Sequence, residues 1–170
     1  MPVEDGDHER SASVSAASGP GAWTTRVERV LNWSRSYSLT PLVLSAGCCT
    51  ASGIEAGIGP RHDLDEFGSG VPHYAPEHAD LLIVGGPIGP RRAPVIASVY
   101  ARMAEPKWVV AYGACACSGG AYGAPETDSG LGSLLPVDIY IPGCPPRSEA
   151  LLDGLSQLRA RIRGEAPRTS

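Results

Sequence analysis

The sequence has few aromatic residues, no long apolar run and no excess of positive charge. Only 6% of its 170 residues are aromatic, with a single phenylalanine. No stretch of roughly eighteen apolar residues occurs, so we expect no membrane-spanning helix. The formal net charge is −4. A nucleic-acid-binding surface needs clustered positive charge, and we therefore expect no nucleic-acid partner.

The length predicts one domain with a tail. Residues 1–22 are rich in Ser, Ala and Gly, which predicts a disordered N-terminal tail. We assign residues 23–164 to a single domain and residues 165–170 to a short C-terminal tail. The N-terminal segment lacks the apolar stretch of a signal peptide. We therefore expect a reducing compartment, where several thiols more often bind metal or take part in catalysis than form disulfides.

Short apolar runs alternate with segments of helical periodicity. The apolar runs predict strands over residues 42–44, 81–84, 108–111 and 137–141. Apolar residues at helical spacing predict helices over 23–36, over 93–105 and from near Pro146 to Ile162. Runs this apolar indicate strands buried on both faces of a parallel sheet. We predict an α/β fold with an open parallel sheet flanked by helices, and a functional loop over the glycine-rich residues 118–133.

Five cysteines occur, and four of them follow predicted strands. Cys48 and Cys49 follow the first strand, Cys115 the third and Cys144 the fourth, while Cys117 lies two residues after Cys115. Open α/β folds place their ligands at the carboxyl ends of parallel strands, which share one edge of the sheet. We therefore expect these four thiols to converge in space.

Four converging thiolates suit either an iron–sulfur cluster or a zinc ion. Structural zinc usually takes C-x2-4-C pairs, which are missing among the four. Adjacent cysteines can reach separate irons of a [4Fe–4S] cube. The turn Gly143-Cys144-Pro145-Pro146 precedes the last predicted helix, whose positive end would stabilise a negatively charged cluster. From these residues alone, a cluster, a zinc site and thiols without a cofactor all remain open.

Several motifs are shared with one known family. The most specific are GACACSGG at residues 113–120 and LPVDIYIPGCPPR at 135–147, and further matches lie at 33–41, 63–68, 79–84 and 105–110. Across about residues 25–163 the chain resembles the family of the complex I B subunits. That family is the 20 kDa subunit of NADH:quinone oxidoreductase, homologous to the small subunit of [NiFe] hydrogenases. The resemblance implies a flavodoxin-like fold and a [4Fe–4S] cluster held by Cys48, Cys49, Cys115 and Cys144.

The resemblance also implies an electron-transfer subunit of an oxidoreductase complex, one that is not active alone. Electrons would pass from its cluster toward quinone at the interface with a large catalytic subunit. The other implied partners are a ferredoxin-like iron–sulfur subunit and membrane subunits. The implied location is peripheral, on the cytoplasmic face of the cell membrane and attached through these partners.

The loop after the tandem cysteines departs from the family pattern. The family reads C-C-x-x-E and then has methionines that line the quinone end, whereas here Glu55 arrives three residues late and is followed by Ala56 and Gly57. Glu55 is a candidate proton acceptor beside the cluster, or a solvated carboxylate. The altered loop 50–57 leaves two alternatives open. One is the small subunit of an energy-converting [NiFe] hydrogenase or hydrogenase-related complex, and the other is a non-redox assembly scaffold.

Two other features have more than one interpretation. Cys117 stands where the family usually has a small polar residue, and is either a spare ligand near the cluster or an uninvolved thiol. Arg91 and Arg92 match a basic pair of the family at the start of the predicted helix 93–105. They contact a partner or lipid headgroups, or form a solvated pair.

Overall fold

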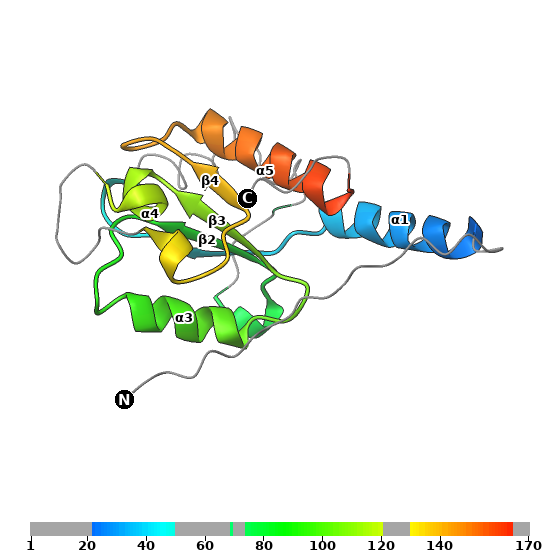
Figure 1. Ribbon diagram of the computed structural model, residues 1–170, viewed down its shortest axis with the longest axis horizontal. Helices are drawn as coiled ribbons and strands as arrows, with labels where there is room; N and C mark the ends of the chain where they lie inside the picture. The colour runs from blue at the N-terminus through cyan, green and yellow to red at the C-terminus, as the bar shows by residue number, and fades with distance from the viewer. Residues whose placement is uncertain (1–21, 50–68, 70–73, 121–129, 165–170) are drawn as a thin grey trace.

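The computed structural model describes residues 22–49, 69, 74–120 and 130–164. These residues contain an open sheet of four strands: β1 (Pro41–Leu44), β2 (Leu81–Gly85), β3 (Trp108–Tyr112) and β4 (Ile139–Ile141). All pairs are parallel and follow the order β1-β2-β3-β4. Figure 1 shows the sheet between layers of helices. The predicted α/β fold, an open parallel sheet flanked by helices, is confirmed.

The central strands are buried on both faces. All five residues of β2 are buried. Leu81 and Ile83 belong to one hydrophobic cluster, whereas Leu82 and Val84 belong to another on the opposite face. Successive side chains of a strand point to opposite faces, so a strand covered on both faces needs an unbroken apolar sequence. This is why the strand reads as a run of apolar residues instead of an alternation.

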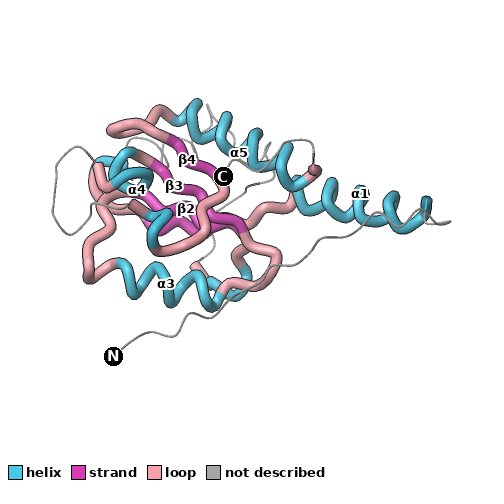
Figure 2. Tube along the Cα trace, in the orientation of Figure 1, coloured by secondary structure: helices cyan, strands magenta, loops and turns pink. Residues whose placement is uncertain are grey.

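Helices cover both faces of the sheet (Figure 2). The helices are α1 (Ala22–Ser36), α3 (Ala93–Arg102), α4 (Ala114–Ser118) and α5 (Ser148–Ile162), and two 3-10 turns are η2 (Pro76–His78) and η3 (Leu131–Ser133). Helix α5 packs on one face and contacts α1, while α3, α4 and η3 pack on the other. The described helical segments between β2 and β3 and between β3 and β4 therefore lie on the same face, which is the arrangement expected of successive right-handed crossovers that advance in one direction.

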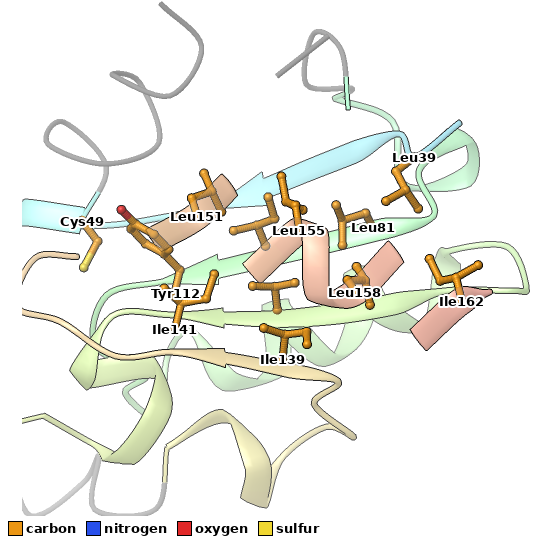
Figure 3. Packing of buried hydrophobic residues seen from close by; sticks show 12 residues of the cluster. Leu39, Cys49, Leu81, Tyr112, Ile139, Ile141, Leu151, Leu155, Leu158 and Ile162 are labelled. Atoms are coloured by element: carbon orange, nitrogen blue, oxygen red, sulfur yellow. The ribbon is translucent and has the colours of Figure 1, made fainter. Parts of the chain in front are cut away.

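Helix α5 supplies much of the core on its face. Its residues Leu151, Leu155 and Leu158 are at most 1% exposed and pack against β2, β3 and β4 (Figure 3). Tyr112 and Cys49 lie side by side at one end of this cluster (Figure 3). The helix begins at Ser148, slightly later than the predicted start near Pro146.

Helix α3 ends three residues before the predicted end at residue 105. Its C-cap, Met103, has an extended backbone with φ −70° and ψ 141°. Lys107 donates from Nζ to the carbonyl oxygens of Tyr100 at 3.1 Å and Met103 at 3.4 Å. A positive charge at this position stabilises the negative end of the helix. Pro106 also disfavours a helical conformation at Glu105.

Strand β4 is shorter than the predicted 137–141 and begins at Ile139. Just before it, the Asp138 carboxylate accepts a hydrogen bond from the Val109 backbone N–H at 2.8 Å. The Asp138 N–H donates to the Val109 carbonyl oxygen at 2.8 Å. A side-chain acceptor thus takes part in pairing with β3 at this point, so the sheet is extended without a further strand residue.

Helix α1 occupies nearly the predicted range, but several of its apolar residues are exposed. Val27, Val30 and Leu31 are 56%, 62% and 47% exposed. The end of the helix is held by Arg159 of α5, whose Nε donates to the Ser36 carbonyl oxygen at 2.9 Å. In Figure 1, α1 extends away from the sheet. Helical periodicity therefore predicted the helix but not how much of it the domain covers.

Several predicted features lie outside the described residues. They are the C-terminal tail 165–170, all but the last residue of the N-terminal tail 1–22, and most of the glycine-rich loop 118–133. In the part of the chain that the structure describes, no helix combines the length and the apolar character needed to cross a membrane.

Candidate metal centre

Four cysteines from three separate segments line one cavity. Cys48 and Cys49 form the start of a helical turn after β1. Cys115 is the second residue of α4, which follows β3, and Cys144 comes three residues after β4. The cavity has a volume of about 250 Å³ and lies at the carboxyl edge of the sheet. The rest of its lining is small residues: Ala46, Gly47, Gly86, Pro87, Ala114, Gly119 and Gly143.

The four thiols differ in burial and influence one another. Cys49 is buried, Cys115 is half-buried, and Cys48 and Cys144 are exposed. Burial raises the pKa of the Cys49 thiol, and the neighbouring Cys48 raises this pKa further. Burial also raises the pKa of Cys115, with added contributions from Cys144 and Cys48. The thiolates would therefore repel one another, and a positively charged metal centre would relieve that repulsion.

Two glycines allow the backbone to approach the sulfur atoms closely. A Cβ built on Gly113 would lie 2.6 Å from the Cys49 Sγ, and one on Gly120 would lie 2.7 Å from the Cys115 Sγ. Both glycines have a positive φ, of 92° and 87°, which side chains rarely adopt. The two sulfurs can occupy these positions only because glycine, which has no side chain, stands at residues 113 and 120.

The turn that carries Cys144 is fastened to its neighbours. The Ala114 N–H at the start of α4 donates to the Gly143 carbonyl oxygen at 2.7 Å. The buried Tyr112 hydroxyl donates to the Pro146 carbonyl oxygen at 3.0 Å. Two hydrogen bonds, one on each side of Cys144, thus hold this turn against the end of β3 and the start of α4.

Cys117 does not line the cavity. Its Sγ lies 3.5 Å from the carbonyl oxygens of Ala111 and Ile141, and the side chain packs with the core on the α3 side of the sheet. Burial raises the pKa of this thiol. Of the two interpretations of Cys117, its position favours a packing role over that of a spare ligand. Sequence spacing could not separate it from Cys115, since both lie on the short helix α4.

The basic pair divides into two different environments. Arg91 is exposed, whereas Arg92 is half-buried and donates hydrogen bonds to the carbonyl oxygens of Leu44, Gly85 and Pro87. The Arg92 guanidinium therefore binds backbone groups of this chain, whereas Arg91 is exposed. The sequence does not reveal this role, because one of the accepting carbonyls, that of Leu44, lies 48 residues away at the end of β1.

Glu55 and the altered loop 50–57 lie outside the described residues. The role of Glu55 as a proton acceptor beside the cluster therefore stays a prediction. The motif at 63–68 lies outside the described residues as well.

The fold and the cavity define a class: an α/β protein with one parallel sheet that gathers four thiols at the carboxyl edge of its strands. Residues 48–158 match the model of the NADH ubiquinone oxidoreductase 20 kDa subunit family. The B subunit of the NADH-quinone oxidoreductase of Aliarcobacter butzleri is 43% identical over 155 residues, covering 90% of this chain and 89% of that protein. The chain therefore belongs to this family, and the resemblance found in the sequence is confirmed.

Two solved structures are similar to this chain. A chain of an archaeal membrane-bound sulfane sulfur reductase, described as a respiratory membrane complex, matches with a TM-score of 0.69 and 31% identity. The match covers 83% of this chain and 79% of that one. A chain of an NAD+-reducing [NiFe]-hydrogenase matches with a TM-score of 0.53 and 23% identity, over 78% of this chain and 96% of that one, and shares the fold.

Proposed function

We propose that this chain is the electron-transfer subunit of an NADH:quinone oxidoreductase-type complex. It carries one [4Fe–4S] cluster on Cys48, Cys49, Cys115 and Cys144. It relays electrons toward quinone at the interface with a large catalytic subunit. The observation that carries this proposal is the convergence of these four cysteines on one cavity at the strand edge.

The arrangement of the thiols favours a cluster over a zinc ion. A single zinc ion draws every thiolate to about 2.3 Å from one point. Within the described ranges, no three His, Cys, Asp or Glu side chains are arranged to hold a single ion. A [4Fe–4S] cube instead binds each thiolate to a different iron, so that the ligands stand farther apart. The small residues of the lining leave room for such a group.

The surroundings of the thiols suit electron transfer. When bound, the cluster accepts one electron and passes it on, alternating between two charge states. Cys49 holds the buried side of the cavity, while Cys48 and Cys144 are exposed. The buried side excludes water and lowers the local dielectric, which sets the reduction potential. The exposed side is where we place the partner subunit, because electron transfer requires the next centre to come close.

The proposed partners follow from the family. They are the large catalytic subunit, a ferredoxin-like iron–sulfur subunit and membrane subunits. We place the chain peripherally on the cytoplasmic face of the membrane, attached through these partners. The relative in the archaeal sulfane sulfur reductase, which is described as membrane-bound, supports attachment to a membrane complex.

Glu55 is included in the proposal as the candidate proton acceptor beside the cluster. Replacing it with Gln in the assembled complex should lower the rate of quinone reduction and change its pH profile. The iron content and the EPR signal should stay unchanged, because the carboxylate is not a ligand in this proposal. A pH profile identical to that of the unmodified complex would identify Glu55 as a solvated carboxylate.

The first test is the content of iron and acid-labile sulfide in protein purified without oxygen, with low-temperature EPR after dithionite reduction. We expect about four of each and an S = ½ signal, the composition of a [4Fe–4S] centre. Cys144→Ala should abolish the signal, whereas Cys117→Ala, the matched control, should retain it. Folded protein that contains zinc or no metal and cannot be reconstituted would refute electron transfer and leave an assembly scaffold.

The second candidate function is the small subunit of an energy-converting [NiFe] hydrogenase or hydrogenase-related complex. The altered loop 50–57 leaves it open, and the 31% identical chain, which comes from a complex described as a sulfane sulfur reductase, indicates that similar chains also serve complexes of another kind than NADH:quinone oxidoreductase. Metal analysis of the complex purified with this chain distinguishes the two. Nickel with hydrogen-dependent dye reduction would support the hydrogenase, and nickel-free, quinone-dependent NADH oxidation would support the first proposal.

A further inference from the structure

The turn between β2 and α3 lies beside the cysteine cavity. Gly86 and Pro87, at the start of this turn, belong to the lining of the cavity. The turn has no cysteine of its own, because β2 is the one strand of the four that no cysteine follows closely. Gly86 has no side chain and can therefore offer only its backbone groups to the cavity, so the contacts that hold this backbone in place matter.

Arg92 ties the ends of two strands together. Its guanidinium donates to the Pro87 carbonyl oxygen at 2.5 Å and to the Gly85 carbonyl oxygen at 3.4 and 3.5 Å. It also reaches the Leu44 carbonyl oxygen, at the end of β1, at 3.4 Å. The planar, forked guanidinium can serve several acceptors at once. These contacts connect the turn after β2 with the strand that leads into Cys48 and Cys49.

The Gly85 carbonyl that Arg92 contacts and the Gly86 N–H belong to one peptide unit, and Gly86 lines the cysteine cavity. Gly86 lines the cavity together with Cys49, and a Cβ on the adjacent Gly85 would lie 3.5 Å from the Cys49 Cβ. Burial raises the pKa of the Cys49 thiol, and the Gly86 N–H offsets part of this rise because it favours the thiolate. On the other side, a Cβ on Gly86 would lie 2.2 Å from the Ala46 carbonyl oxygen, and the Ala46 N–H donates to the Gly85 carbonyl oxygen at 3.2 Å. The Gly86 amide is thus enclosed between the Cys49 loop and the carbonyls that Arg92 holds.

We infer that Arg92 is a positioning residue for the cluster. It orients the Gly86 amide toward the Cys49 sulfur and raises the reduction potential of the cluster. Hydrogen bonds to cluster sulfurs stabilise the reduced, more negative state and so raise the potential. The half-buried positive charge of Arg92 acts in the same direction, because it is screened less than an exposed charge. This inference rests on the proposed function.

The experiment compares three variants with the unmodified protein, all with the cluster loaded. Arg92→Gln removes both the positive charge and the planar guanidinium, whereas Arg92→Lys keeps the charge but replaces the guanidinium with a single amine. Arg91→Gln is the matched control, since it removes an adjacent but exposed charge. Iron and sulfide contents are measured first, followed by the midpoint potential from an EPR-monitored redox titration.

We expect the potential to fall in Arg92→Gln, shifting the balance between reduced and oxidised cluster by up to about tenfold, or ~59 mV for one electron. Arg92→Lys should lie between this value and that of the unmodified protein. Arg91→Gln should match the unmodified protein. A folded Arg92→Gln protein that loses iron, with iron restored in Arg92→Lys, would also support the inference.

Each failure has a distinct meaning. An unmodified protein without a cluster refutes the proposed function itself. A loaded Arg92→Gln protein whose potential equals that of the unmodified protein refutes only the role of Arg92. If Arg92→Gln does not fold, Arg92→Lys decides: a lowered potential supports the inference, and an unchanged potential refutes it.

Discussion

Gly113 lies between β3 and α4, next to the Cys49 thiol. Its φ of 92° and ψ of 156° belong to a region that is essentially restricted to glycine. We expect Gly113→Ala to destabilise the fold by about 1–3 kcal/mol through backbone strain. The added Cβ would also displace the Cys49 sulfur, 2.6 Å away. Urea unfolding and iron content measure the two effects.

Gly47→Ala is the control for this prediction. Gly47 also lines the cavity and has a positive φ of 71°, but a Cβ there would meet no atom within 4 Å. This variant should lose about 1–2 kcal/mol from its backbone conformation and retain its iron. If both variants retain iron equally, close approach to the sulfur is not what requires glycine at position 113.

Because of Tyr112, the stability of the fold should vary with pH in the alkaline range. Burial, with the charge of Cys49 as a lesser cause, raises its pKa to about 12. An unfolded tyrosine has a pKa of about 10. Between these values the unfolded chain loses a proton that the folded chain keeps. The contribution of Tyr112 is therefore fully present below about pH 10 and is lost as the pH rises toward 12.

Tyr112→Phe should remove both this pH dependence and the hydrogen bond to the Pro146 carbonyl oxygen. Near pH 8 we expect the variant to be less stable by about 1 kcal/mol. Above pH 10 the difference should shrink with each further pH unit. Urea unfolding of the reduced apoprotein at pH 8 and at pH 11 measures this difference in stability. A difference that stays constant from pH 8 to 11 would contradict the assignment of the raised pKa to this residue.

At the scale of the elements, the two long helices stabilise the domain to different extents. Leu155 of α5 is 1% exposed, whereas Leu31 of α1 is 47% exposed. We expect Leu155→Ala to destabilise the fold by about 2–5 kcal/mol. Leu31→Ala, the same chemical change on the other helix, should cost about 0.5 kcal/mol or less. Similar values in urea unfolding would mean that α1 is covered in the folded chain.

The elements that could be predicted were the ones whose residues carry a repeated pattern. Strand β2 and helix α5 follow from a continuous apolar run and from apolar residues at helical spacing. Helix α4 was not predicted, because a helix of five residues is too short to display a period. At the early end of α3 the Lys107 amine binds the Tyr100 carbonyl oxygen, a contact that no periodicity contains, whereas Pro106 is a signal that the sequence does carry.

At the scale of the whole molecule, a bound cluster would connect the ends of β1, β3 and β4. A group that binds only the folded chain stabilises it. We expect chelation of the iron to lower Tm. A loss of about 2 kcal/mol corresponds to roughly 4–8 °C for a domain of this size. Circular dichroism of loaded and chelated protein measures this shift.

The Cys117→Ser variant should show the same difference between its loaded and chelated forms, because Cys117 lies outside the cavity. Equal Tm values for the loaded and chelated unmodified protein would show that the bound group does not couple the three strand ends to the stability of the fold.

The sequence by itself determined the α/β class and the set of four cysteines after strands. Both follow from local order along the chain: apolar runs, helical spacing and the position of each thiol after its strand. The convergence of the thiols could also be predicted, because parallel strands end at one edge. Only the tertiary structure decided that Cys117 lies outside the cavity and that Arg92 holds the turn at Gly86. Those outcomes depend on side-chain direction and on contacts between strand ends that are distant in sequence.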